Sequence, residues 1–203
     1  MHDSAAIGAD GVWWGAIRAA VAAHDPEPVD PAGRPTAAVL VPLLPTGDEP
    51  HVLFTVRSYE VEHHKGEISF PGGMIEEGEG PEAAALREAW EEVGIGIGEV
   101  EVLGPLSHFI TSSGFHIRPF VGLLPHAPYA YNVNPAEVAD VLEVPLNHLF
   151  DDANATYYRR ELNGSEVTVR EYLWGDHVIT GATAWMLRIF LAMVAEQLGR
   201  VHD

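Results

Sequence analysis

Residues 72–95, GGMIEEGEGPEAAALREAWEEVGI, decide the fold and the chemistry that this chain can carry. A proline at the start of a run of helix-forming residues, and a glycine just after that run, predict a helix over 81–93. Within this helix Glu88, Glu91 and Glu92 stand at positions i, i+3 and i+4. Residues at these spacings are neighbours on a helix surface, so we expect the three carboxylates to project from one face.

Three carboxylates so close together repel one another and weaken an isolated helix. A divalent cation removes the conflict, because carboxylate oxygens are the ligands that hard cations such as Mg²⁺ and Mn²⁺ prefer. The plain alternative is a solvated acidic helix face, on a chain with 30 acidic side chains. Two neighbouring features favour the metal. Arg87 can pair with a carboxylate and fix its orientation, and Gly72 and Gly73 allow the preceding loop an unusual backbone path.

This segment resembles the signature of the Nudix hydrolases: a glycine, five residues, a glutamate, seven residues, then Arg-Glu-aliphatic-x-Glu-Glu-x-Gly-aliphatic. The matching positions are Gly73, Glu79, Arg87, Glu88, Ala89, Glu91, Glu92, Gly94 and Ile95. The resemblance implies an α/β fold of the α/β/α sandwich type with a mixed central sheet, in which water attacks a diphosphate linkage. It further implies metal ligands at Glu88, Glu91 and Glu92, an orienting role for Arg87, and Mg²⁺ or Mn²⁺ as the cofactor.

A second resemblance narrows the substrate. Residues 53–73, LFTVRSYEVEHHKGEISFPGG, are similar to the upstream signature of the coenzyme A diphosphatase branch of that family. The positions in register are Leu53, Thr55, Arg57, Ser58, Gly66, Phe70, Pro71, Gly72 and Gly73. This resemblance implies cleavage of coenzyme A or its thioesters to phosphopantetheine and adenosine 3',5'-bisphosphate. The substrate-binding candidates are Arg57, Ser58, Lys65, Gly72 and Gly73.

One departure from the branch leaves the substrate open. Glu62 stands where the branch has an arginine, and a glutamate there would repel a substrate phosphate. The cations that can take over its role are Arg57, His63, His64 and Lys65. An ADP-ribose or other nucleoside diphosphate hydrolase is therefore the alternative reading of the substrate. A Nudix-like binding module without catalysis is the alternative from another class, and the complete signature disfavours it.

Hydrolysis also needs a group that orders or deprotonates the attacking water. In Nudix enzymes this group is often a glutamate outside the signature helix, at a position that varies between branches. Glu137, in the stretch NPAEVADVLEVPL, is the first candidate, with Glu143 and Asp140 as runners-up. A glutamate of the helix can itself serve, so the predicted catalytic residues are Glu137, Arg87 and Glu92.

The remaining elements follow from apolar spacing and turn residues. A helix is predicted at 11–24, with apolar positions at Val12, Trp13, Ile17, Ala20 and Val21. A second is predicted at 182–198, with Trp185, Leu187, Ile189, Phe190 and Met193 buried. Strands are predicted at 37–44, 51–57, 68–70, 100–109 and 117–124. Residues 137–150 are predicted to hold a strand and a helical turn, and Asn163-Gly164 to close a hairpin between 155–162 and 165–174. The predicted division is an N-terminal helix with a proline-rich lead-in over 1–35, and a Nudix hydrolase domain over 36–203.

Composition limits the partners. The chain has 203 residues, no cysteine and a formal charge of −19, so we expect no nucleic acid polymer as partner. The resemblance implies a small-molecule nucleotide instead. No apolar run approaches the roughly 18 residues of a membrane helix, so no membrane partner and a cytoplasmic location are expected. Trp13, Trp14 and the apolar last helix either line a homodimer interface or fill the core.

Overall fold

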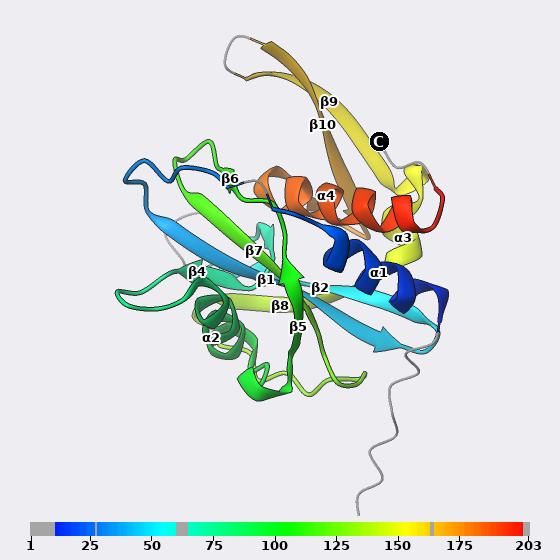
Figure 1. Cartoon of the computed structure of the whole chain (residues 1–203), viewed down its shortest axis with the longest axis horizontal. Coiled ribbons are helices and arrows are strands. Elements are labelled where there is room, and N and C mark those ends of the chain that lie inside the picture. Colours follow the sequence, from blue (N-terminus) through cyan, green and yellow to red (C-terminus); the bar gives the residue numbers. More distant parts are fainter. Residues whose placement is uncertain (1–10, 27, 60–64, 163–164, 201–203) are drawn as a thin grey trace, which may run out of the picture.

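The computed structural model describes residues 11–26, 28–59, 65–162 and 165–200. Its body is one mixed sheet between two layers of helices (Figure 1). The helices are α1 (Val12–Ala23), α2 (Pro81–Val93), α3 (Leu146–Phe150) and α4 (Gly181–Gln197). The strands of the central sheet are β1 (Thr36–Thr46), β2 (Glu49–Arg57), β3 (Ile68–Ser69), β4 (Gly72–Met74), β5 (Glu101–Pro105), β6 (Phe109–Ile110), β7 (His116–Leu123) and β8 (Val138–Pro145).

Strand β1 is the centre of the sheet and fixes where the signature loop lies. It runs antiparallel to β2 and to β4, and parallel to β7. On one side of β1, Ala38 pairs with Gly73 of β4, and on the other side the same residue pairs with Arg118 of β7. The loop that precedes α2 is therefore held as a short strand, one strand away from β7.

The two faces of the sheet carry separate hydrophobic clusters, because successive side chains on a strand point to opposite faces. On β1, Val39, Val41 and Leu43 belong to the cluster that includes α1 and α4. Ala38 and Leu40 belong to the cluster that includes α2. The result is a helix–sheet–helix arrangement, and the predicted α/β/α sandwich with a mixed central sheet is confirmed (Figure 1).

Helix α2 lies close against the sheet because its inner face is made of small residues. Ala84, Ala85 and Ala89 are fully buried there, and alanine is also the best helix former. The helix ends at Gly94, whose φ of 74° is left-handed, and a Cβ at this position would lie 2.7 Å from the Cβ of Asn132. The limits predicted for this helix from its proline and its glycine are confirmed.

The predicted N-terminal helix is present as α1, and Ile17, Ala20 and Val21 are buried as expected. Trp14 is buried, whereas Val12, expected inside, is 78% exposed. Trp13 packs against Phe150 of α3, with 5.5 Å between the ring centroids. Both tryptophans thus make contacts within the chain, in the cluster that α1 shares with α4 and the sheet. The homodimer and the domain limit at residue 35 stay predictions.

Two other predicted elements differ in detail. The strand expected over 100–109 is divided into β5 and β6, and the pairing of β5 with β7 shifts register between Val102 and Gly104. The last helix buries Leu187 and Phe190 as expected, but Trp185, Ile189 and Met193 are only partly buried.

A second, three-stranded sheet contains β9 (Ala155–Leu162), β10 (Ser165–Trp174) and β11 (His177–Ile179). The β9–β10 hairpin was predicted, whereas β11 was not. The turn residues of the hairpin, Asn163 and Gly164, lie outside the described residues. Figure 1 shows the hairpin projecting beyond α4, away from α2. Across the described ranges, no helix combines the length and the apolar character needed to span a membrane.

Candidate active site

Arg87 stands at the centre of an acidic cluster on α2. Its guanidinium pairs with both carboxylate oxygens of Glu79, at 2.9 and 3.1 Å. Nη1 donates to Glu88 Oε1 at 2.9 Å and to Glu91 Oε2 at 2.7 Å, and Nη2 donates to the Met74 carbonyl at 2.9 Å. The hydrogen bonds with Glu79 are the main reason why the pKa of Arg87 is raised and that of Glu79 is lowered. One arginine thus holds three carboxylates in fixed orientations.

The three glutamates of the helix do not share one environment. Glu92 is 5% exposed and Glu88 is partly buried, so both face the sheet. The side chain of Glu91 is 41% exposed and lies on the flank of the helix. Glu88 and Glu92, one turn apart, lie inward, and Glu91 lies at the exposed edge, where Nη1 of Arg87 donates to both Glu91 and Glu88.

Burial and like charge act together on the two inner carboxylates. Burial, followed by repulsion from Glu88 and Glu137, raises the pKa of Glu92 to about 8, although Arg57 and a backbone hydrogen bond from Gly72 act in the opposite direction. Burial also raises the pKa of Glu88. Oε2 of Glu92 is buried and has no hydrogen-bond partner among the described residues. The negative charge of Glu88 and Glu92 is therefore not fully compensated by the groups around them.

Gly72 and Gly73 are required for space rather than for an unusual backbone path. They form β4, and neither is among the described residues with positive φ. A Cβ on Gly73 would lie 2.5 Å from the carboxyl carbon of Glu88, and a Cβ on Gly72 would lie 2.5 Å from the Ala38 carbonyl oxygen. The expected unusual backbone path is wrong: glycine is needed because Gly73 lies directly beneath Glu88 of α2 and Gly72 lies close against β1.

The segment that resembles the coenzyme A branch ends at this same cluster. Arg57 is the last residue of β2, and its charge lowers the pKa of Glu92. Its Nε is buried and has no hydrogen-bond partner in the described part of the chain. Ser58 is buried, and its N–H donates to the Glu137 carbonyl at 2.8 Å. Arg57 and Ser58 therefore lie against the acidic cluster.

Lys65 lies farther out than the other substrate-binding candidates. It is exposed, in a turn that closes on β2 through a hydrogen bond of 3.1 Å from the Gly66 N–H to the Arg57 carbonyl. Three residues of this segment lie outside the described residues: Glu62, which departs from the branch, and His63 and His64, which follow it.

Glu137 is brought against the acidic cluster although it is far from α2 in sequence. Its charge raises the pKa of both Glu88 and Glu92. Asn134 Nδ2 donates to Glu137 Oε1 at 3.2 Å, and the Asn134 N–H donates to the Glu92 carbonyl at 2.8 Å. Asn134 thus ties the candidate base to the end of α2. Sequence reasoning missed this asparagine, although an asparagine before a proline is a known signal for a turn.

The two runners-up for the base have other partners. Glu143 Oε1 accepts a hydrogen bond from the Tyr131 hydroxyl at 2.7 Å. Asp140 Oδ1 accepts one from the Val141 N–H at 2.8 Å. Of the three candidates, Glu137 is the one whose carboxylate lies at the cluster.

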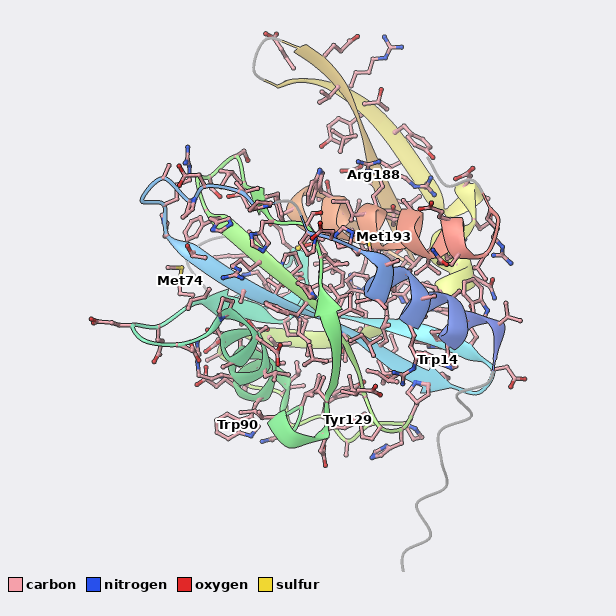
Figure 2. The ribbon with its side chains drawn as sticks, viewed as in Figure 1. Trp14, Met74, Trp90, Tyr129, Arg188 and Met193 are labelled. Carbon is pink, nitrogen blue, oxygen red and sulfur yellow. The ribbon has the colours of Figure 1, made fainter. Side chains whose placement is uncertain are left out.

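A pocket of about 520 Å³ opens beside the cluster. Its lining residues are Trp90, Glu91, Asn132, Val133, Asn134 and Glu137. Trp90 projects outward from α2 and is 55% exposed (Figure 2). The volume is in the range of small-molecule sites, and the pocket connects the exposed helix carboxylate Glu91 to Glu137.

Comparison with known proteins identifies the family. The NUDIX domain model matches residues 34–162, which include the signature helix and Glu137. The chain is a Nudix hydrolase. It is 38% identical over 152 residues to a Nudix hydrolase, NudL, of Photorhabdus laumondii, and covers 80% of that relative with 74% of its own length. It is 36% identical over 155 residues to NudL of Yersinia pestis, with 75% of this chain and 76% of the relative covered. Both relatives are described as uncharacterized.

The fold agrees with this membership. A MutT/nudix family protein from Enterococcus faecalis superposes with a TM-score of 0.55 at 15% identity, over 87% of this chain and 70% of that protein. At this identity the likeness bears on the fold alone. By its family, the chain is a Nudix pyrophosphohydrolase.

Nudix hydrolases generally require a divalent metal ion, and the donor set of this Nudix hydrolase fits one. Oε2 of Glu92 is buried without a partner among the described residues, and burial, followed by neighbouring carboxylates, raises the pKa of Glu92; burial also raises the pKa of Glu88. Within the described ranges, no three Asp, Glu or His side chains are already grouped to hold an ion. Arg87 engages one oxygen of Glu88 and one of Glu91, which are then positioned next to Glu92.

Proposed function

We propose that this Nudix hydrolase cleaves the diphosphate of coenzyme A or of its thioesters, giving phosphopantetheine and adenosine 3',5'-bisphosphate. The observation that carries the proposal is the position of the segment 53–73, which resembles the coenzyme A branch. Its residues Arg57 and Ser58 lie against Glu92 and Glu137. A substrate diphosphate bound at the acidic cluster would therefore contact this segment.

We assign the metal ligands to Glu88, Glu91 and Glu92. A divalent ion bound there supplies the positive charge that offsets the diphosphate, and it lowers the pKa of a bound water. Arg87 positions Glu88 and Glu91 and is itself anchored by Glu79. A positioning residue of this kind commonly changes metal affinity or activity by about 10- to 100-fold when it is replaced.

We assign the role of general base to Glu137. Its carboxylate takes the proton of the attacking water while a P–O bond of the diphosphate breaks. Asn134 holds Oε1 of this carboxylate in place. Arg57 faces the phosphates with a guanidinium whose Nε has no other partner among the described residues, and Gly72 and Gly73 leave room for substrate and carboxylates together.

A substrate panel tests the proposal. Purified protein is incubated with Mg²⁺ and, separately, Mn²⁺, and phosphate release is measured after coupling to a phosphatase. We expect coenzyme A to be cleaved faster than ADP-ribose, NADH or dinucleoside polyphosphates. A rank for coenzyme A among the poorest substrates contradicts the proposal.

The base is tested by replacing Glu137 with Gln, with Asp140→Asn as the matched control on the neighbouring strand. Loss of a general base typically costs about 10²- to 10⁴-fold, so we expect kcat of the Glu137 variant to fall by at least about 100-fold. The Asp140 variant is expected to stay within about twofold of the wild type. Equal rates for the two variants would remove Glu137 from the mechanism.

The second candidate substrate is ADP-ribose or another nucleoside diphosphate derivative, because Glu62 opposes a phosphate where the branch has a cation. The substitution Glu62→Arg is then expected to raise the turnover of coenzyme A relative to ADP-ribose. An unchanged ratio would mean that this position does not select the substrate.

A further inference from the structure

A second polar cluster, made of His108, His116 and Arg118, has no role in the reaction described above. His116 is 5% exposed, and both of its ring nitrogens are buried with no hydrogen-bond partner among the described residues. The same holds for Nδ1 of His108 and Nε of Arg118. The two imidazole rings lie 5.2 Å apart, at an interplanar angle of 61°. Buried polar groups are normally satisfied, so these four nitrogens call for a ligand or ordered water.

The strand register places this cluster beside the acidic cluster. Arg118 pairs with Ala38, which pairs in turn with Gly73. Directly paired residues point to the same face of a sheet, and Ala38 packs in the cluster beneath α2, so Arg118 also points to the α2 face. His116 lies two residues earlier on the same strand and shares this face. Two strand spacings, roughly 10 Å, separate the Cα atoms of Arg118 and Gly73, and Glu88 lies directly over Gly73.

The chemistry of the cluster favours an anion over a metal cation. Burial lowers the pKa of both histidines, and the positive charge of Arg118 lowers it further, so each ring is neutral near pH 7 and offers one N–H donor. Arg118 makes no ion pair within the described residues. Its guanidinium would repel a metal ion bound by the two rings. An unpaired guanidinium beside N–H donors is instead suited to a phosphate group.

We propose that His108, His116 and Arg118 bind a phosphate monoester which the substrate carries one ribose away from the diphosphate that is cleaved. The inference rests on the proposed function, because the adenosine of coenzyme A carries a 3'-phosphate on the ribose whose 5'-carbon carries the diphosphate. ADP-ribose has no such group. The cluster therefore selects coenzyme A over nucleoside diphosphate derivatives without a phosphate monoester.

Binding of two product-like nucleotides tests the site without turnover. The protein is titrated calorimetrically with adenosine 3',5'-bisphosphate and with AMP, which differ only in the 3'-phosphate. We expect the bisphosphate to bind at least tenfold more tightly. Arg118→Met is expected to abolish this preference, Arg118→Lys to retain part of it, and His116→Gln to weaken it. Arg159→Met, which removes the same charge from an exposed arginine on β9, is the control and should retain the full preference.

Equal affinities of the wild type for the two nucleotides would overturn the proposal, and so would a full preference in Arg118→Met. Because Arg118 is only partly buried, its replacement is less disruptive than that of His116, and the far-ultraviolet circular dichroism of each variant checks that it is folded.

Kinetics separate this inference from the proposed function. The ratio of kcat/KM for coenzyme A to that for dephospho-coenzyme A is expected to be about ten in the wild type and in Arg159→Met, and about one in Arg118→Met. If coenzyme A is cleaved no faster than dephospho-coenzyme A by the wild type, the phosphate site is wrong and the proposed function stands. If neither coenzyme A nor dephospho-coenzyme A is cleaved, but the preference for adenosine 3',5'-bisphosphate over AMP depends on Arg118, the proposed substrate is wrong and the phosphate site stands.

Discussion

The two faces of the central sheet differ in what they bury. The face beneath α1 and α4 buries large apolar side chains, among them Trp14 and Phe190. The face beneath α2 also buries large apolar side chains, such as Leu40 and Phe120, but here they lie with the alanines of α2 and the carboxyl group of Glu92. Burying an aromatic side chain stabilises a fold, whereas burying a carboxylate costs free energy unless it is compensated. Both faces therefore contribute apolar burial, and the α2 face gives up part of that stability to place a carboxyl group.

The clearest departure from the usual rules of burial on the second face is Glu92. A pKa of about 8 for Glu92 reflects an environment that resists its charged form. Departures of this kind are concentrated at functional sites, where a ligand supplies what the fold does not. If the comparison is right, mutations on the two faces will separate activity from stability.

The largest effect is expected for Glu92→Gln, and a similar one for Glu91→Gln. Each substitution removes one of the proposed metal ligands, so kcat should fall by about 1,000-fold, equivalent to about 4 kcal/mol of transition-state stabilisation. The unfolding free energy without metal should be unchanged or higher, because like-charge repulsion is relieved. Glu82→Gln, in the first turn of the same helix, is the control. A loss of activity under tenfold, or a lower melting temperature without metal, would break the comparison.

The opposite behaviour is expected for Phe190→Ala on the other face. Phe190 is fully buried, and truncation of such a residue costs about 3–5 kcal/mol. Urea unfolding should detect this loss, while kcat per folded molecule stays near that of the wild type. Trp90→Ala is the matched aromatic change on α2, and because this side chain is exposed its unfolding free energy should change by no more than about 0.5 kcal/mol. Equal destabilisation by the two changes would contradict the division between the faces.

An intermediate effect is expected for Arg87→Lys. Lysine keeps the charge but cannot pair with Glu79, Glu88 and Glu91 at once, so activity should fall by about 10- to 100-fold. The metal concentration for half-maximal activity should rise, which a purely structural role would not produce. Arg18→Lys, at the exposed pair with Glu101, is the control. An unchanged metal requirement would show that Arg87 does not position the ligands.

The smallest effect is the pH dependence of the metal-free fold. The pKa of Glu92 is about 8 in the folded chain, against an ordinary value near 4.5. The folded state therefore binds this proton more tightly than the unfolded state, and stability is lost as pH rises from about 4.5 through 8. Urea midpoints measured in EDTA should fall over this range in the wild type and fall less in Glu92→Gln. Parallel profiles for the two proteins would mean that Glu92 is not the group responsible.

Local features of the chain made much of the site predictable. Pro81 and Gly94 marked the limits of α2, and the spacing of Glu88, Glu91 and Glu92 indicated the acidic cluster within a single helix. These signals depend on residues within a few positions of one another, so the sequence contains them directly. The α/β/α layering followed from the resemblance of this same segment to a known signature.

Features that depend on strand register could not be predicted in this way. Nothing local indicates that Arg118 lies two strands from Gly73, because the residue between them, Ala38, comes from a third part of the chain. The contact between Asn134 and Glu92 likewise forms only when β8 pairs with β2. The burial of Trp14 in place of Val12 was missed for a related reason: the burial of these positions is set by the way α1 packs against α4.

The three buried alanines of α2 set the depth at which the signature helix sits. A larger side chain at position 85 or 89 would push the helix axis away from the sheet. The carboxylates of Glu88 and Glu92 would then move away from Gly73, over which Glu88 lies. These small side chains thus fix the distance between α2 and the sheet. Tuning this enzyme by mutation would then begin with residues that carry no charge and touch no substrate.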